Sequence, residues 1–150
     1  MSTSDLILVT GATGKIGSSI AKHLERLGKE LRLLVRDLNK LSNFPEAEKV
    51  TGDYGDIDSL DRAFRGVSSA FIVSGYAETG ERAKLHRNAF RAAQRAGIRY
   101  LIYLSTLGAS SDSCRDSPCR KAGPRTNHFL QQPSGHRWAR CAPERSSAWR

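Results

Sequence analysis

Three glycines near the N-terminus have the spacing of a phosphate-binding turn. Gly11, Gly14 and Gly17 follow the apolar run Leu6–Thr10 and precede an amphipathic segment, an order that predicts a strand, a tight turn and a helix. Gly11 permits the turn, Gly14 lets the backbone approach a phosphate, and Gly17 lets the helix pack closely on the strand. A pyrophosphate would then lie at the helix N-terminus. We therefore expect a dinucleotide site here, with an ordinary tight turn as the alternative.

The residues after the second predicted strand, Leu31–Val35, favour one cofactor over another. An NAD site usually has Asp or Glu at this position, where the carboxylate accepts hydrogen bonds from the ribose hydroxyls. This chain has Arg36, with Lys40 four residues later, and a guanidinium can pair with a 2′-phosphate. Asp37 is expected to point away or to cap the next segment. The pattern predicts NADP(H) rather than NAD(H), and the alternative is a solvated Arg-Asp turn.

Polar residues also follow the third, fourth and fifth predicted strands. Asp53 could accept a hydrogen bond from the adenine amino group. A metal site made with Asp56 and Asp58 is disfavoured, because these two residues suit the start of a helix. Ligands of open α/β sheets bind beyond the carboxyl ends of the strands, so the chain could flank a nicotinamide ribose and ring there. The candidates are Val73, Ser74 and Ser105, although strand-end serines also form turns.

The sequence does not identify a catalytic residue. Each of the four tyrosines lacks a lysine four positions later, so a tyrosine general acid paired with a lysine is absent. His86 is expected at the surface of a helix. Arg87, Arg91 and Arg95 recur every four residues and are interpreted as a solvated helix face.

These residues are positioned by alternating strands and helices, which predict right-handed βαβ units and a parallel sheet. The expected fold class is α/β, a Rossmann-like three-layer sandwich with strand order 3-2-1-4-5, incomplete at its C-terminal side. The predicted strands are Leu6–Thr10, Leu31–Val35, Glu48–Thr51, Ser69–Val73 and Arg99–Ser105, and the predicted helices are Lys15–Leu27, Ile57–Phe64 and Glu81–Ala96.

The composition changes after residue 110. Residues 111–150 hold 8 of the 24 Lys and Arg but only 3 of the 15 Asp and Glu, together with all 3 cysteines and both tryptophans. Prolines recur and no helical or strand period is visible, so we expect an NAD(P)-binding domain over 1–110 and a poorly ordered basic tail over 111–150. The cysteines lack zinc spacing, and no metal is expected.

The balance of charge and hydropathy narrows the partners. The net charge of +9 is typical of proteins that bind nucleic acid. The basic residues of the tail form no helical stripe, however, so nucleic acid is an unlikely partner. Neither a signal segment nor a run of ~20 apolar residues is present, which predicts a soluble, cytoplasmic protein without a membrane partner.

Four segments in this order resemble the atypical short-chain dehydrogenase/reductases. They are Val9–Gly17, Val35–Asp37, Gly52–Tyr54 and Ala92–Ser105, and the most similar branch is the NmrA-like NAD(P)-binding proteins with their quinone-reductase relatives. The resemblance covers residues 5–110. It implies NADP(H) held by Gly11, Thr13, Gly14, Lys15 and Ile16, with Arg36 at the 2′-phosphate and Asp53 at adenine. Members include NADPH-dependent reductases and non-catalytic redox-sensing regulators.

The same resemblance implies a helix, a sixth strand and a substrate lobe that are not legible after about Ser113. Our hypothesis is a frameshifted or otherwise aberrant translation beyond this point. Read from the third base of each codon, Arg140–Ser146 can encode Leu-Arg-Pro-Gly-Ala-Phe, a segment typical of the family. The leading interpretation is an NAD(P)H-dependent oxidoreductase that passes hydride to a small quinone-like acceptor. The alternatives are a non-catalytic dinucleotide-sensing regulator and an inactive truncated product.

Overall fold

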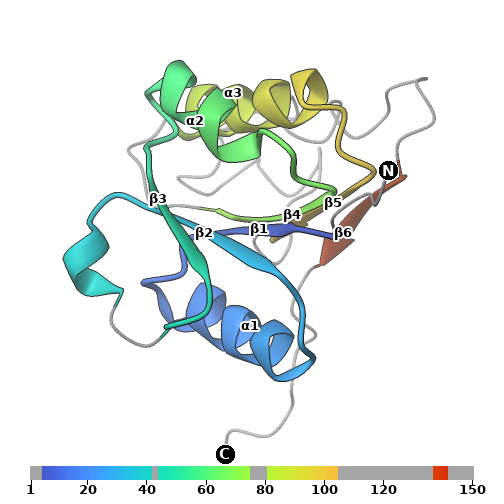
Figure 1. The fold of residues 1–150 in the computed structure, drawn as a ribbon. Helices are drawn as coiled ribbons and strands as arrows, with labels where there is room; N and C mark the ends of the chain where they lie inside the picture. The colour runs from blue at the N-terminus through green and yellow to red at the C-terminus, as the bar shows by residue number, and fades with distance from the viewer. Residues whose placement is uncertain (1–4, 42–43, 75–80, 105–136, 142–150) are drawn as a thin grey trace, which may run out of the picture.

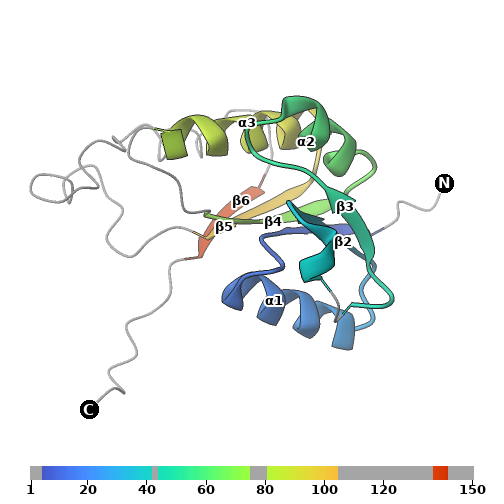
Figure 2. The ribbon, with the colours of Figure 1, turned by 90° about the vertical axis from the view of Figure 1, so that its left-hand side faces the viewer.

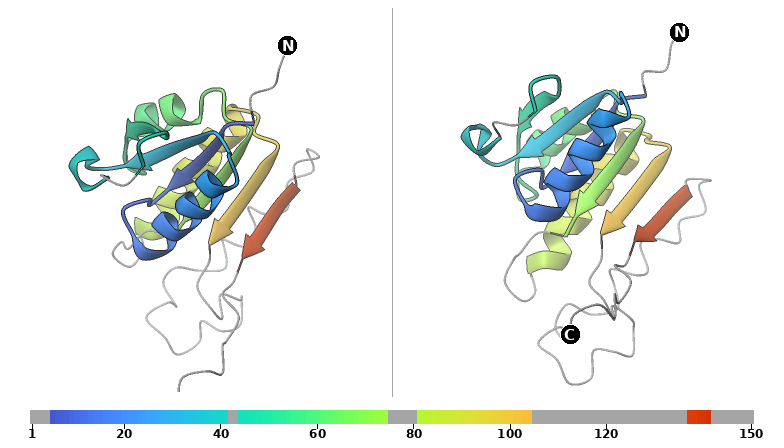
Figure 3. Two further views of the ribbon diagram at one scale, coloured as in Figure 1. Left: turned by 60° about the horizontal axis from the view of Figure 1, so that its bottom comes forward. Right: turned by 90° about the horizontal axis from the view of Figure 1, so that it is seen from below.

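The computed structural model describes residues 5–41, 44–74, 81–104 and 137–141 as one parallel sheet with helices on both faces (Figure 1). The strands are β1 (Ile7–Thr10), β2 (Leu31–Val35), β3 (Glu48–Thr51), β4 (Ser69–Val73), β5 (Tyr100–Leu104) and β6 (Arg137–Cys141). The helices are α1 (Lys15–Arg26), the 3₁₀ turn η1 (Leu38–Lys40), α2 (Ile57–Phe64) and α3 (Glu81–Arg95). The strand order is β3-β2-β1-β4-β5-β6, and every neighbouring pair is parallel (Figure 3).

The two faces of the sheet bury separate cores, because successive strand residues point to opposite sides. Helix α1 covers one face, whereas α2 and α3 cover the other (Figure 2). In β1, Leu8 belongs to the core under α2 and α3, and the next residue, Val9, belongs to the core under α1. The chain therefore forms the three-layer α/β sandwich predicted from its sequence.

The predicted elements agree closely with the observed ones. Strands β2, β3 and β4 and helix α2 have the predicted bounds, and β1, β5, α1 and α3 are each shorter by one or two residues. The order 3-2-1-4-5 is confirmed. Gly28 and Gly97, with φ of +67° and +66°, end α1 and α3 as expected of glycines in the left-handed region.

A sixth strand was not predicted. Arg137–Cys141 pairs in parallel with β5, from Tyr100↔Arg137 to Leu104↔Cys141, and this strand occupies the edge of β5 that the sequence left open. The segment contains two arginines and lacks the apolar run that identified β1, β2, β4 and β5. These five residues thus form a strand that the sequence did not predict, while the poorly ordered tail and the division of the chain at residue 110 remain predictions.

The inward faces of two helices agree with the prediction only in part. The sequence predicted the inward residues Ile16, Ile20, Ala21, Leu24 and Leu27 for the first helix and Leu85, Ala89, Ala92, Ala93 and Ala96 for the third. In α1, Ala21 is buried and Ile20 and Leu24 pack against the core, whereas Ile16 and Leu27 are 46% and 59% exposed. In α3, Ala89, Ala92 and Ala93 are buried as predicted, Ala96 is exposed, and His86 and Phe90 are also buried. No helix among the described residues is long and apolar enough to cross a membrane.

Candidate cofactor site

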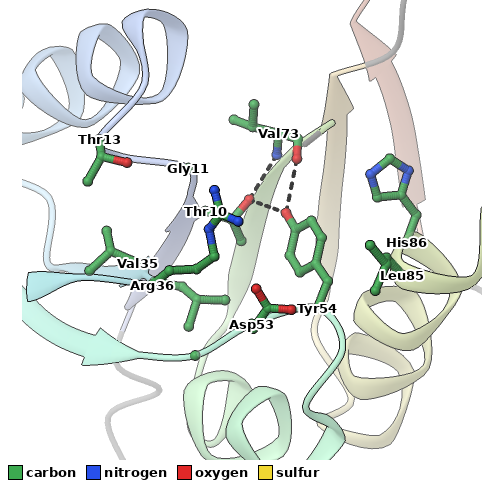
Figure 4. A pocket seen from close by; sticks show the side chains of 12 residues that line it. Thr10, Gly11, Thr13, Val35, Arg36, Asp53, Tyr54, Val73, Leu85 and His86 are labelled. Atoms are coloured by element: carbon green, nitrogen blue, oxygen red, sulfur yellow. Dashed lines mark hydrogen bonds between the residues drawn. The ribbon is translucent and has the colours of Figure 1, made fainter. Parts of the chain in front are cut away.

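A cavity lies at the carboxyl ends of β1 to β4, bounded on one side by α3 (Figure 4). Its volume is about 160 Å³, against the ~10–15 Å³ that a single water needs. The residues that line it are Thr10, Gly11, Thr13, Leu34, Val35, Arg36, Gly52, Asp53, Tyr54, Val73, Leu85 and His86. This is the edge at which ligands of open α/β sheets bind. Five of the predicted site residues are brought together here, namely Gly11, Thr13, Arg36, Asp53 and Val73.

The glycine turn leaves no room for side chains at two of its three glycines. Gly11 has φ of +65°, and a Cβ placed on it would lie 3.1 Å from the Val73 Cβ. A Cβ on Gly17 would lie 2.2 Å from the Gly11 carbonyl oxygen, closer than any real contact. The amide of Gly14 donates to the same carbonyl over 2.9 Å. Gly11 and Gly17 therefore have the conformational and packing roles predicted for them.

The N-terminus of α1 is well suited to an anion. Gly14 is its N-cap residue and supplies no side-chain acceptor, and the first turn contains no acidic residue. Thr13, Lys15 and Ile16 are exposed beside it. The unpaired amides and the positive end of the helix dipole would favour a phosphate group at this point. The binding of a pyrophosphate at this turn stays a prediction.

Arg36 is exposed directly after β2 and lines the cavity. Within the described part of the chain, its guanidinium has no ion pair or hydrogen bond. Lys40 does not line the cavity, and its Nζ lies 4.0 Å from Asp37 Oδ2. Asp37 caps η1 by accepting a hydrogen bond from the Asn39 amide over 3.0 Å, as expected. The structure thus places Arg36, but not Lys40, at the rim of the cavity.

Asp53 lies at the cavity with one carboxylate oxygen already engaged. Its Oδ1 accepts a hydrogen bond of 2.7 Å from the Gly55 amide, which leaves Oδ2 as the oxygen available to a ligand. Asp56 caps α2 by accepting from the Ser59 amide over 3.1 Å, the helix-start role predicted for it. Among the described residues, no cluster of three His, Cys, Asp or Glu side chains could hold a metal ion.

A closed hydrogen-bond ring in the cavity wall was not predicted. The Val73 amide donates to Thr10 Oγ1 over 2.9 Å, and the Tyr54 hydroxyl donates to the Val73 carbonyl over 3.0 Å. Thr10 Oγ1 and the Tyr54 hydroxyl are 2.6 Å apart (Figure 4). Because the Tyr54 hydroxyl donates its proton to the Val73 carbonyl, Thr10 is the donor between the two hydroxyls. Burial raises the pKa of Tyr54 above its usual range, so the phenol stays protonated. The ring joins β1, β4 and the loop after β3.

His86 is buried rather than exposed, contrary to the prediction. It is 1% exposed, its Nδ1 lies 2.9 Å from the Tyr103 hydroxyl, and its ring packs edge-on against Tyr54 at a centroid distance of 5.7 Å. Burial lowers the pKa of His86 to about 4, assisted by the positive charge of Arg82. The ring is therefore neutral near pH 7. Charged neighbours in the sequence suggested a solvated position, but His86 falls on the same face of α3 as Phe90.

The remaining strand-end residues are less fully placed. Val73 lines the cavity and contributes both backbone groups to the hydrogen-bond ring. Ser74 is half-buried after β4 and is not among the lining residues. Ser105 lies outside the described residues. The sequence contained one indication of the roles of Thr10 and Tyr54. A hydroxyl side chain directly precedes Gly11, and another ends the Gly52-Asp-Tyr54 segment.

Comparisons with known proteins identify the family of the chain. A family described as NAD(P)H-binding matches residues 11–133. The chain is 34% identical over 139 residues to (4-alkanoyl-5-oxo-2,5-dihydrofuran-3-yl)methyl phosphate reductase of Streptomyces griseus, over 92% of this chain and 47% of that protein. It is 33% identical over 111 residues to quinone oxidoreductase 2 of Escherichia coli, over 71% of this chain and 38% of the relative. The family match continues past residue 110, where the resemblance was expected to stop.

Solved structures of NADP(H)-binding reductases resemble the fold of this chain. The triphenylmethane reductase of Citrobacter sp., complexed with NADP(H), superposes with a TM-score of 0.69 at 28% identity, covering 83% of this chain and 44% of that one. The NADPH-dependent quinone oxidoreductase of Escherichia coli, complexed with NADPH, gives 0.66 at 27% identity, covering 81% and 44%. This chain spans less than half the length of each of these relatives. It belongs to the NAD(P)H-binding family, in the NmrA-like group of atypical short-chain dehydrogenase/reductases.

Proposed function

We propose that this chain binds NADP(H) in preference to NAD(H), and that it is the cofactor-binding part of an oxidoreductase for a small quinone-like acceptor. The observation that carries the preference is Arg36, an exposed guanidinium at the cavity rim without an ion pair in the described part of the chain. A 2′-phosphate would supply the missing partner, whereas an NAD site usually has a carboxylate here. Two relatives whose solved structures are described as complexes with NADP(H) or NADPH support the same cofactor preference.

Most of the predicted site residues receive a role in this proposal. The amides at the N-terminus of α1, including that of Ile16, would bind the pyrophosphate, with Thr13 and Lys15 beside them. Asp53 Oδ2 would accept a hydrogen bond from the adenine amino group. Val73, Ser74 and Ser105 would border the nicotinamide half. When bound, the dinucleotide supplies the hydride, and the chain supplies position and the exclusion of water.

A second candidate is a non-catalytic regulator that responds to the dinucleotide. Two observations favour it. The sequence has no Tyr-x-x-x-Lys pair, and the chain is 31% identical over 134 residues to nitrogen metabolite regulation-like protein bik4 of Gibberella fujikuroi, over 83% of this chain and 39% of the relative. In this role, cofactor binding would change affinity for a partner rather than lead to turnover.

One experiment separates these functions. NADPH and NADH are titrated into the protein with cofactor fluorescence as the readout, and NADPH oxidation is then followed with a benzoquinone as acceptor. Tighter binding of NADPH with turnover supports the reductase, and binding without turnover supports the regulator. The absence of binding at millimolar cofactor would contradict both.

Gly14→Asp provides the matched negative variant. Gly14 is exposed at the helix N-cap, a position that suits aspartate, and this side chain would place bulk and negative charge against the pyrophosphate. Its Cβ would lie 3.3 Å from the Gly11 carbonyl oxygen, a tight contact, so the melting temperature of the free variant is measured as the folding control. We expect more than a hundredfold loss of affinity for both cofactors in a variant that folds. Unaltered binding would show that the cofactor does not lie across this turn.

A further inference from the structure

The least expected side chain in the cavity wall is a neutral histidine on α3. The buried face of α3 is otherwise made of Ala89, Phe90, Ala92 and Ala93, all apolar. His86 interrupts this face, is 1% exposed, and lines the cavity next to Leu85. A ring that served only to fill space would be better replaced by an apolar one, because burial of a polar ring costs free energy unless its nitrogens are hydrogen-bonded.

Only one of the two ring nitrogens has a partner. Nδ1 lies 2.9 Å from the Tyr103 hydroxyl. Nε2 has no hydrogen-bond partner among the residues that the structure describes, and it is not one of the fully enclosed atoms among them. A nitrogen that is nearly buried, unpaired and beside a cavity is positioned to meet a ligand.

The surroundings of His86 indicate the chemistry of that ligand. In Figure 4, Tyr54 lies between Asp53 on one side and the α3 residues Leu85 and His86 on the other. Leu34, Tyr54 and Leu85 provide apolar and aromatic walls, whereas Asp53 and His86 provide polar groups. This combination suits a flat heteroaromatic ring with nitrogens on its edge, and a neutral imidazole can pair with such a nitrogen without introducing a charge.

We propose that His86 is a binding residue for the adenine base of the dinucleotide, with Nε2 donating a hydrogen bond to a ring nitrogen of the purine. This inference rests on the proposed function, and it adds a base-recognition residue to Asp53. It requires that the Tyr103 hydroxyl donates to Nδ1, because the ring proton then resides on Nε2. Tyr103 thus acts as a positioning residue that sets the tautomer.

Two substitutions distinguish the nitrogens. His86→Gln places an amide nitrogen near the position of Nε2 and loses the Nδ1 contact, whereas His86→Asn keeps an acceptor near Nδ1 and loses the group at Nε2. The probes are NADPH and adenosine 2′,5′-bisphosphate, which contains the base and the 2′-phosphate but no nicotinamide. His23→Asn, at an exposed position near the end of α1, is the control variant.

We expect His86→Asn to weaken both probes by the same factor, about 3- to 10-fold, which corresponds to one hydrogen bond. His86→Gln is expected to stay within about twofold of the unmodified protein, as is the His23 control. A weaker NADPH but unchanged bisphosphate, equal affinities in all variants, or a larger loss in His86→Gln would each overturn the proposal.

A measurement on the unmodified protein keeps the test valid if a variant does not fold. The ¹⁵N resonance of His86 Nε2 is followed while adenosine 2′,5′-bisphosphate is added, with that of His23 as the internal reference. A shift confined to His86 supports the contact. Binding of NADPH with a His86 signal that does not move overturns this inference alone, whereas failure of the unmodified protein to bind NADPH overturns the proposed function with it.

Discussion

The two sides of the cavity are built on different physical principles. On the β1–β2 side, the ligand would meet backbone amides, three glycines and the exposed Arg36. On the side towards α3, it would meet a wall of hydrogen-bonded groups. Thr10, Tyr54 and Val73 form a ring of hydrogen bonds of 2.6 to 3.0 Å, and His86 forms a separate hydrogen bond of 2.9 Å with Tyr103. The two sets, called here the buried network, meet through the edge-on contact of the Tyr54 and His86 rings.

The difference separates two tasks. Under the proposed function, the glycine side would act by shape and by partial charge, and so would decide whether a pyrophosphate can approach. Its exposed cation would act through solvent and would add a cofactor preference of modest size. The buried side fixes the spacing of strands and rings, so its polar groups matter to stability as much as to binding. The predictions below test whether these tasks are in fact separate.

The largest effect is expected at Gly17. Even a methyl group there would lie 2.2 Å from the Gly11 carbonyl oxygen and 2.6 Å from its carbon, so Gly17→Ala forces α1 away from the turn. We expect the free energy of unfolding to fall by more than about 3 kcal/mol, since the clash exceeds the ~1 kcal/mol that alanine gains in a helix. Urea unfolding measures the change.

Ser19→Ala is the control for Gly17→Ala, because it also places an alanine in α1 but at an exposed position. It should leave stability within about 0.5 kcal/mol. If Gly17→Ala were as stable as this control, the turn would be flexible. This result would contradict the idea that the glycine side selects ligands by shape.

The next effect concerns pH and belongs to the buried side. The pKa of His86 is about 4 in the folded protein against 6.5 in the unfolded chain. Between these values the unfolded chain binds more protons, so the free energy of unfolding decreases as the pH falls from 6.5 to 4. The full contribution, present above pH 6.5, is about 3 kcal/mol.

Unfolding by urea at pH 7.5, 6.0 and 5.0 measures this loss. His86→Gln cannot titrate, so its stability should change much less over the same range. Ser19→Ala, which removes no titratable group from an exposed position, should keep the slope of the unmodified protein. Identical pH profiles for the unmodified protein and His86→Gln would contradict the burial of a neutral imidazole.

A smaller loss is expected from Tyr54→Phe. Without the hydroxyl, the Val73 carbonyl loses its donor and Thr10 Oγ1 loses its acceptor in a partly buried ring of hydrogen bonds. We expect a destabilisation of about 2 kcal/mol and a weaker affinity for NADPH and NADH alike. Tyr100→Phe, at a residue that is 52% exposed, is the control. A loss of NADPH affinity alone would show that the tyrosine takes part in cofactor choice.

The sequence predicted the fold and the glycine side for the same reason. Each βα unit is local, so hydrophobic periodicity identified β1 to β5 and the three α-helices within one or two residues. The glycine spacing spans seven residues and is equally local. The buried network joins residues that are 17, 44 and 63 positions apart, and no single-sequence pattern reports such contacts.

One expectation stays a prediction, and one element was missed for a physical reason. Lys40 was expected beside the 2′-phosphate; it does not line the cavity, and its exposed Nζ lies 4.0 Å from Asp37 Oδ2. Strand β6 was missed because its residues do not form an apolar run. Since the family match reaches residue 133, the aberrant segment that we propose either begins later than Ser113 or keeps enough of the family pattern to be matched. The sequence of the gene over codons 111–150 would test this directly.

The smallest effect is expected at Arg36, and it concerns only the choice between NADPH and NADH. Arg36→Ala removes the exposed guanidinium at the rim without disturbing a described contact. We expect about tenfold weaker binding of NADPH, or ~1.4 kcal/mol, and no change for NADH. The preference should also shrink at high salt, since an exposed pair is screened. Lys40→Ala, at a side chain that is 72% exposed and points to Asp37, should have a smaller effect. Equal losses of NADPH and NADH in Arg36→Ala would mean that this arginine acts on the shared adenosine, and the preference would then have to come from the buried side.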